Sequence, residues 1–301
     1  MKVKRIASLF CSFGIGLACC LSVIASRAEE RFTLETAKAG AEKGDARAEY
    51  FLGKQYLKGV DVPQDYAKAA DYFRKAAEQG LPAAQNDLGA LYAKGLGVKR
   101  DYVEAAKWYL KAGEQGDDLA QYSLGRIYEE GRGVAKDPKE SLKWYHKAAE
   151  QNQPDALVTL GDLYCFGGNG VSVNNAEALK YYTNAAAHGR SDCLASLGVV
   201  YEKCTQIPGH YDLALKCFRE AAAKKDGNAE AELGLMYRDG KGVQKDLVEA
   251  YKWFLRAQRH GCRLAIRHLQ ELRGVDPLVR STNNVLTAQQ MAEGEDRAAG
   301  E

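Results

Sequence analysis

Small and apolar residues recur along the chain with one long period. A Leu-Gly dipeptide appears six times at steps of 36 or 37 residues, and a tyrosine stands three positions after each of these glycines. Self-similarity of this length is typical of a repeat protein, in which each unit stacks on its neighbours. The dipeptides begin at Leu52, Leu88, Leu124, Leu160, Leu197 and Leu233.

Each unit predicts two helices. In the second unit, Ala84, Leu88 and Leu91 are spaced by three or four residues and therefore share one helical face. Gly95 is expected to end this helix, because glycine adopts the left-handed conformation at little cost. A second apolar face runs through residues 105–112, so the unit is expected to form an antiparallel helix pair.

A polar residue that can cap a helix precedes several of the second helices. Asp101 stands three residues before Glu104, the spacing of a capping box, in which each side chain satisfies amides of the first turn. The recurrence of this spacing in phase with the repeat marks the start of the second helix. It is found again at Asp137 and Glu140, Asn174 and Glu177, and Asp246 and Glu249.

The glycine of each Leu-Gly lies inside a predicted helix, where it costs ~1 kcal/mol relative to alanine. Six recurrences at that cost predict a close approach of two helices, with large rings such as Tyr56 and Trp108 filling the space beside the small residues. No unit can bury its aromatic face alone, so neighbours must stack. The sequence predicts an all-α fold, a right-handed α-solenoid of about six antiparallel helix pairs, with more than about 65% helix and essentially no strand.

The consensus of the units resembles a known family. The pattern A-x-x-x-LG-x-x-Y-x-x-G-x-GV-x-x-D-x-x-x-A-x-x-WY-x-x-A-A-x-x-G is similar to that of Sel1-like repeats, which are relatives of the tetratricopeptide repeat. The resemblance assigns residues 45–261 to six repeats, residues 29–44 to an N-terminal half-repeat helix and residues 262–273 to a C-terminal capping helix. It implies an α-solenoid that binds other proteins, as exported bacterial adaptors of this family do in envelope assembly and host contact.

The end of the chain, residues 274–301, is expected to be a linker followed by a short polar helix. Thr287 would cap this helix, with Gln290 in the capping-box position. A frayed polar tail is the alternative.

The start of the chain has the three parts of a secretory signal peptide. Three of its first five residues are basic, residues 6–24 carry no charge, and Ser26 and Ala28 place small side chains before Glu29. We therefore expect residues 1–28 to be removed and the protein to be exported, either periplasmic or secreted. A retained membrane anchor is the alternative, because the uncharged run is just long enough to span a bilayer.

The charge balance excludes some classes of partner. Lys and Arg number 42 and Asp and Glu number 40, a net charge of +2. Loss of residues 1–28 would remove four basic side chains and no acidic one, which leaves a nearly neutral protein. There is no electrostatic case for binding nucleic acid or anionic lipid. The expected partner is a protein or peptide, with membrane contact only through an uncleaved signal.

No pattern in the chain indicates catalysis or a cofactor. The glycine-rich breaks follow helices, and G-x-x-x-x-G-K-[ST], H-E-x-x-H, G-x-S-x-G and S-x-x-K are all absent. The spacing of His260, Cys262 and His268 matches no zinc site. We predict no catalytic residues, no cofactor and no metal. Two rival functions are a binder of cell-wall glycan or peptidoglycan and a hydrolase acting on cell-wall material.

The candidate binding residues lie on the first helices. By analogy with tetratricopeptide domains, these helices line the concave side, where rings and directed hydrogen-bond donors can anchor a peptide. A solvated face that binds no ligand is the alternative, and a failed binding test would move the site to the convex side or the tail. The predicted partner-binding residues, taken as solvent-exposed positions near the Leu-Gly, are Tyr50, Lys54, Asn86, Tyr122 and Arg126.

Five cysteines follow the signal: Cys165, Cys193, Cys204, Cys217 and Cys262. Helical spacing argues against each obvious pair within the fifth unit, so we predict no intramolecular disulfide. Cys193 occupies the small buried position that alanine takes in the other units. Cys204 replaces a helix-ending glycine and is expected to be the most reactive thiol, at an exposed helix end.

Overall fold

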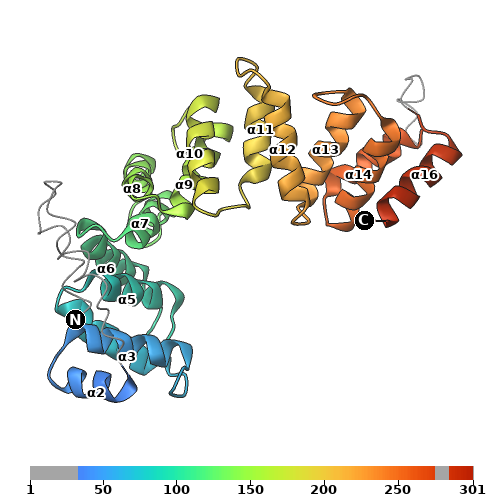
Figure 1. Ribbon diagram of the computed structural model, residues 1–301. Coiled ribbons are helices and arrows are strands. Elements are labelled where there is room, and N and C mark those ends of the chain that lie inside the picture. The colour runs from blue at the N-terminus through green and yellow to red at the C-terminus, as the bar shows by residue number, and fades with distance from the viewer. Residues whose placement is uncertain (1–32, 275–284, 301) are drawn as a thin grey trace, which may run out of the picture. The chain divides into compact units, whose positions relative to one another are not determined.

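The computed structural model describes residues 33–274 and 285–300, so the predicted signal peptide lies outside the described residues. Within them, 71% of residues are helical, and the extended pairing is limited to an isolated bridge between Gly168 and Val171. The predicted all-α solenoid is confirmed (Figure 1).

The helices fall into two compact units, divided between Leu81 and Pro82. The first unit contains α2 (Leu34–Glu42), α3 (Ala46–Lys58) and α4 (Tyr66–Glu78). The second unit contains α5 (Pro82–Lys94), α6 (Tyr102–Glu114), α7 (Asp118–Glu130), α8 (Pro138–Glu150), α9 (Pro154–Phe166), α10 (Asn175–Ala187), α11 (Leu194–Lys203), α12 (His210–Ala222), α13 (Gly227–Asp239), α14 (Leu247–Arg259), α15 (Arg263–Leu272) and α16 (Ala288–Ala299).

The helices pack as the period predicts. Each repeat consists of a first helix packed on a second helix, from α3 with α4 to α13 with α14. Inside the second unit, each second helix also packs on the first helix of the next repeat, for example α6 on α7 and α12 on α13. Within the second unit, one cluster of buried apolar side chains extends from Tyr145 of α8 to Met236 of α13 and so spans several successive repeats, as stacking requires.

The glycine of each Leu-Gly allows its helix to lie directly against a ring of the second helix. A Cβ on Gly161 would lie 2.6 Å from the ring of Tyr182, which is closer than real contacts allow. The same arrangement joins Gly89 to Tyr109 and Gly234 to Phe254. The expectation that Tyr56 and Trp108 fill this space is wrong. The ring against the glycine is the second member of each aromatic pair, whereas Tyr56 stacks on Tyr72, with ring centroids 5.7 Å apart.

The predicted N-caps are present, but the return hydrogen bond from the glutamate side chain to the capping residue is not. Asp101 accepts hydrogen bonds from the amides of Val103 and Glu104 at the start of α6. The Glu104 carboxylate does not return to the cap, because it pairs with Lys107 one turn further along. Lysine follows the equivalent glutamate by three residues in α8, α10 and α14, and it forms the same pair in each. In all four helices, the glutamate therefore pairs with this lysine and does not complete the capping box.

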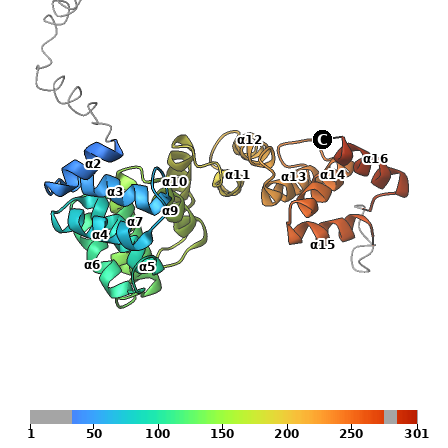
Figure 2. The same ribbon diagram turned by 90° about the horizontal axis from the view of Figure 1, so that it is seen from below.

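The last helix packs against the last complete repeat. Thr287 and Gln290 form the expected capping box at the start of α16, and Figure 1 and Figure 2 both show α16 beside α14. A Cβ on Gly294 would lie 2.8 Å from the ring of Tyr251, so a glycine again permits close approach to a ring. Arg259 also donates to the carbonyl oxygen of Ala298 at 2.9 Å, which ties the end of α16 to α14.

A polar pair, in which the member on the first helix is buried, links the two ends of several repeats. In the second repeat, the amide of Gln115 donates to Gln85, and in the third repeat Gln151 donates to Gln121, both at 2.8 Å. The first repeat uses Glu49 and Gln79, and the sixth uses Glu230 and His260. The fourth and fifth repeats have Leu157 and Leu194 at the first position instead. The position therefore accepts either a hydrogen-bonded pair or an apolar side chain.

The five cysteines are free and buried. The prediction of an exposed, reactive Cys204 is wrong, because only 1% of this residue is accessible to solvent. Its backbone has a φ of −86° and does not enter the left-handed conformation of the glycine it replaces. Its carbonyl oxygen accepts a hydrogen bond from Ile207, which closes a turn there. Burial also raises the pKa of the Cys204 thiol, which lowers its thiolate fraction at neutral pH.

We expect the native protein to react slowly with a thiol reagent at pH 8 and to show five thiols only after denaturation. Burial raises the pKa of Cys193 and Cys217 to about 11, so their reactive thiolate forms are scarce at that pH. Timed labelling followed by intact mass measures the rates. Rapid modification of Cys204 alone would contradict its burial.

The Ser141→Ala variant should unfold at higher denaturant concentration, with a gain of about 1 kcal/mol. Ser141 is fully buried, and its hydroxyl has no hydrogen-bond partner among the described residues. The other five repeats carry alanine at this position. Ser123→Ala is the matched control, because the Ser123 hydroxyl does donate to the Leu119 carbonyl at 2.9 Å. Urea unfolding measures both variants, and a loss of stability in Ser141→Ala would contradict the orphaned hydroxyl.

Candidate functional site

The first helix of the first repeat places two predicted binding residues together. Tyr50 and Lys54 lie one turn apart on α3, and the Lys54 ammonium is 5.7 Å from the centroid of the Tyr50 ring. Tyr50 also packs on Phe73 of α4, with ring centroids 5.6 Å apart and planes tilted by 40°. Phe73 is the ring that covers Gly53, so the Tyr50 ring packs directly on a side chain of the core.

The third repeat builds the same arrangement. Tyr122 and Arg126 lie one turn apart on α7, and Tyr122 packs on Tyr145 with a centroid distance of 5.7 Å and a tilt of 40°. Arg126 is exposed and donates to Glu130 at 3.1 Å. Tyr145 is fixed in turn, because its hydroxyl donates to Glu129 at 2.7 Å. We call each combination of surface tyrosine, underlying ring and cation a tyrosine–cation cluster.

The second repeat does not continue this pattern. Asn86 is only 8% exposed, so the expectation that it presents a solvent-exposed amide is wrong. Its side chain contacts the neighbouring Asp87 at 3.4 Å. The position one turn later, which is Lys54 and Arg126 in the clusters, is Ala90 here. Asn86 therefore lacks both the accessibility and the neighbouring cation of the two tyrosines.

A tyrosine–cation cluster has the chemistry of an anchor for a protein partner. The ring offers a rigid amphipathic surface at small entropic cost, and the neighbouring cation supplies a directed donor for a carbonyl or carboxylate. Because the surface tyrosine already rests on a buried ring, little side-chain freedom remains to be lost on binding.

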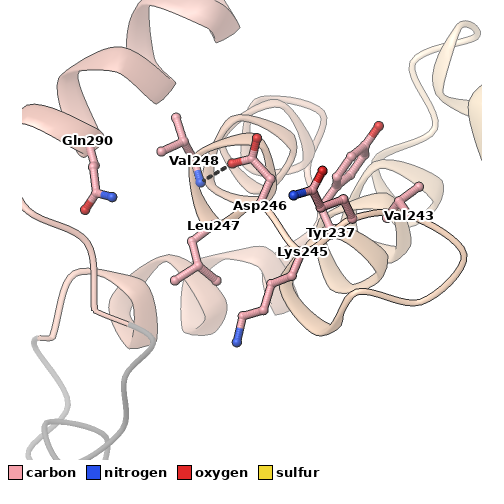
Figure 3. A pocket seen from close by; sticks show the side chains of 8 residues that line it. Tyr237, Val243, Lys245, Asp246, Leu247, Val248 and Gln290 are labelled. Atoms are coloured by element: carbon pink, nitrogen blue, oxygen red, sulfur yellow. Dashed lines mark hydrogen bonds between the residues drawn. The ribbon is translucent and has the colours of Figure 1, made fainter.

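A separate cavity of about 630 Å³ lies at the start of α14, where α16 approaches. Figure 3 shows its lining side chains, with the Asp246 carboxylate accepting a hydrogen bond from the amide of Val248 and Gln290 of α16 at the edge. Leu247, Val243 and Val248 supply apolar surface, and Tyr237, Gln244 and Lys245 supply polar edges. Asp246 is committed to capping α14, so it contributes no free carboxylate to the cavity.

In two repeats, the second turn glycine lies against the first turn of the preceding second helix. A Cβ on Gly242 would be 2.6 Å from the Cβ of Tyr211, and a Cβ on Gly133 would be 2.3 Å from the carbonyl group of Tyr102. Leu247, which lines the cavity, is the equivalent residue of α14.

The described residues contain no cluster of three or more His, Cys, Asp or Glu side chains suited to a metal ion. His260 instead contacts the buried Glu230 at 2.6 Å, and His268 lies between Glu271 at 3.0 Å and Arg238 at 3.3 Å. In the same part of the chain, no helix combines the length and apolar character needed to cross a membrane.

Sequence reasoning missed one exposed feature, the turn between α9 and α10. Phe166 and Val173 are both largely exposed there. The signal was available in the repeat itself, because the residue equivalent to Phe166 is charged in the five other repeats.

Helix pairs stacked at a 36-residue period define a repeat scaffold of the tetratricopeptide-like class. The sequence model of the Sel1 repeat matches six successive stretches, and the chain therefore belongs to the Sel1 repeat family. The matched stretches are 46–81, 82–117, 118–153, 154–189, 192–226 and 227–262.

One of the similar solved structures supports this assignment. A Sel1 repeat protein from Oxalobacter formigenes is 32% identical, with a TM-score of 0.65 over 83% of this chain and 96% of that one. A protective antigen of uropathogenic Escherichia coli with an SLR fold, c5321, is 27% identical, with a TM-score of 0.44 over 89% and 86% of the two chains. Immunity protein Pa5087 from Pseudomonas aeruginosa is 22% identical, with a TM-score of 0.42 over 72% and 83%. No curated protein matches the chain.

Sel1 repeats are in general non-catalytic scaffolds that bind other proteins, and the fold of this chain is that scaffold. The two tyrosine–cation clusters and the terminal cavity are its most distinctive local features.

Proposed function

We propose that the chain is an exported, non-catalytic adaptor that binds a protein or peptide partner through the faces of its first helices, which we expect to form the concave surface. The observation that carries this proposal is the recurrence of the tyrosine–cation cluster in repeats 1 and 3. Two independent helices place a tyrosine on a buried ring at the same 40° tilt, with a cation one turn away.

The two tyrosines whose pKa values are raised most support a structural role for their hydroxyl groups over a catalytic one. Burial raises the pKa of Tyr145 and of Tyr182 well above the ordinary range, and the acceptors Glu129 and Asp162 raise both further. Both rings are fully buried against the glycines of first helices. These hydroxyls are fixed in the core, where a substrate does not reach them.

The stacked tyrosines at the ends of the first helices argue against a glycan site there. Tyr164 and Tyr181 lie nearly parallel with centroids 5.7 Å apart, as Tyr56 and Tyr72 do. Each ring therefore already covers one face of the other, which leaves at most one face of each ring for a sugar. Peptide arrays against glycan arrays, probed with the protein from Glu29 onward, separate the two binders. Signals confined to glycans would overturn the proposed function.

Export is tested separately. N-terminal sequencing of the protein recovered from outside the cytoplasm should begin at Glu29, because Ser26 and Ala28 provide the cleavage signal. An intact Met1 in the membrane fraction would contradict removal of residues 1–28.

The site is tested by combined substitution of the predicted residues. Changing Tyr50, Lys54, Tyr122 and Arg126 together to alanine should abolish binding to peptides selected on the array while leaving the helical circular dichroism unchanged. Asn86→Ala, made alone, is expected to have little effect on binding, because the side chain is buried. Unchanged binding by the fourfold variant would move the site to the convex side or the tail.

A further inference from the structure

The turn between α9 and α10 presents the most exposed apolar pair near any of the turns between paired helices. Phe166 is 62% exposed and Val173 is 59% exposed. They flank the same short segment, and the Val173 side chain lies over Gly167, 3.6 Å from the position a Cβ would take there. Both exposed side chains therefore lie beside Gly167, and we call the pair the Phe166 patch.

Both residues depart from what the other repeats place at these positions. The equivalents of Phe166 are all charged, and those of Val173 are polar or glycine. The equivalents of Phe166 are Lys58, Lys94, Glu130, Lys203 and Asp239, and those of Val173 are Gln64, Arg100, Lys136, Gly209 and Lys245. Other repeats accept a charged residue at each of these two positions, so packing does not require either apolar side chain.

The segment that carries the patch is anchored to the scaffold. It is one residue longer than the other turns and folds back on itself, with mutual backbone hydrogen bonds between Gly168 and Val171 of 3.3 and 2.7 Å. Asn169, at its tip, donates to Glu129 of the preceding repeat at 2.7 Å. Glu129 also accepts the hydroxyl of the buried Tyr145, so the turn is tied to the core. A patch held in place loses little conformational entropy on binding.

One cation lies beside the patch. The Lys203 ammonium is 6.0 Å from the centroid of the Phe166 ring. Among the described residues it takes part in no ion pair, in contrast to Lys241, which binds Glu202 at 2.5 Å. An apolar pair with an uncommitted ammonium at its edge is complementary to an apolar side chain that has a carboxylate close to it.

We propose that the Phe166 patch is a second docking site, for an acidic segment of a protein partner that inserts an apolar side chain between Phe166 and Val173 and places a carboxylate on Lys203. This site lies on a turn and is independent of the tyrosine–cation clusters on the first helices. It extends the proposed function from one binding surface to two, and it would give a bivalent ligand more affinity than either surface alone.

The test uses three labelled peptides and fluorescence anisotropy with the protein from Glu29 onward. The first peptide has Leu-Phe flanked on each side by Asp-Glu, the second has lysines in place of the acids, and the third has Ser-Ser in place of Leu-Phe. The first peptide should bind at least about tenfold more tightly than the other two, since each tenfold step needs only ~1.4 kcal/mol of differential contact.

The first variant uses residues that other repeats carry at the equivalent positions. Phe166→Lys with Val173→Lys introduces a residue type found at the same positions elsewhere, so it should fold normally and lose the acidic peptide. Lys203→Glu should reverse the preference toward the lysine peptide. Tyr50→Ala should leave binding of the acidic peptide unchanged, because Tyr50 packs on Phe73 in the first repeat, and this separates the site from the proposed concave one.

Three outcomes would overturn the proposal. One is equal binding of the three peptides, and another is full retention of binding by the Phe166→Lys, Val173→Lys variant with native circular dichroism. The third is a dimer in sedimentation that this variant abolishes, which would show that a second copy of the chain covers the patch.

Discussion

Replacing Gly161 by alanine is expected to destabilise the protein by about 3 kcal/mol, although alanine is the better helix former. A Cβ at this position would lie 2.6 Å from two atoms of the Tyr182 ring. The ring has no room to retreat, because Tyr182 is fully buried and its hydroxyl donates to Asp162 at 2.5 Å. Relief therefore requires α9 and α10 to separate, which opens the core of the repeat. Urea unfolding followed by circular dichroism and aromatic fluorescence measures the loss.

Gly113→Ala is the matched control within the same fold. Gly113 is also helical and buried, but its Cβ would chiefly meet the end of the Leu124 side chain, at 2.8 Å, and that end can shift. Most of the other repeats carry alanine at this position. We expect this variant to stay within about 1 kcal/mol of the parent, because the gain in helix propensity offsets the repacking. Equal losses for the two variants would contradict the special role of the Leu-Gly glycine.

Replacing Glu230 by alanine is expected to cost about 3 kcal/mol. The Glu230 carboxylate is fully buried, where it accepts from Arg256 at 3.1 Å and contacts His260 at 2.6 Å. Its removal leaves a void and two groups without their acceptor. Arg256 and His260 are both partly exposed and can reach water, which keeps the loss below that of a fully enclosed pair. Urea unfolding, with hydrogen exchange to locate the loss in α13 and α14, measures it.

The second repeat suggests a double variant that should compensate for the loss of the Glu230 carboxylate. Glu230→Gln combined with His260→Gln recreates the neutral pair of Gln85 with Gln115 in the second repeat, where the two amides are 2.8 Å apart. We expect the double variant to recover stability to within about 1 kcal/mol of the parent. If it is as unstable as Glu230→Ala, the charge itself and not the hydrogen bond is what the position requires.

The regular part of the fold could be predicted because the signal was repeated in phase. Leu-Gly, the aspartate caps and the helix-ending glycines such as Gly95 each recur, and the structure places them where the period indicates. What the pattern could not decide is which of two competing partners a side chain takes. Glu104 could return to the cap or pair with Lys107, and the ion pair forms. Tyr109 and Trp108 are adjacent, and only the helix orientation decides that Tyr109 covers Gly89.

The candidate site was less predictable, because exposure depends on packing that single residues do not reveal. Tyr50 and Tyr122 were chosen for their residue type, but their support by Phe73 and Tyr145 became visible only in the structure. Asn86 occupies the same position and is buried. Cys204 sits where other repeats turn with glycine, and its different backbone path draws the thiol inside. At Cys204, sequence reasoning therefore failed where the residue departs from the repeat consensus.

Site-specific photo-crosslinking tests the central claim, that a protein partner contacts the first-helix faces. Photoreactive benzoylphenylalanine in place of Tyr50 or Tyr122 keeps a ring at each cluster, and the same group in place of Lys107 marks the exposed side of a second helix. Irradiation of cells producing each exported variant should give a covalent adduct to one protein from positions 50 and 122, and none from position 107. Adducts from position 107 alone would contradict the account and place the partner on the second helices.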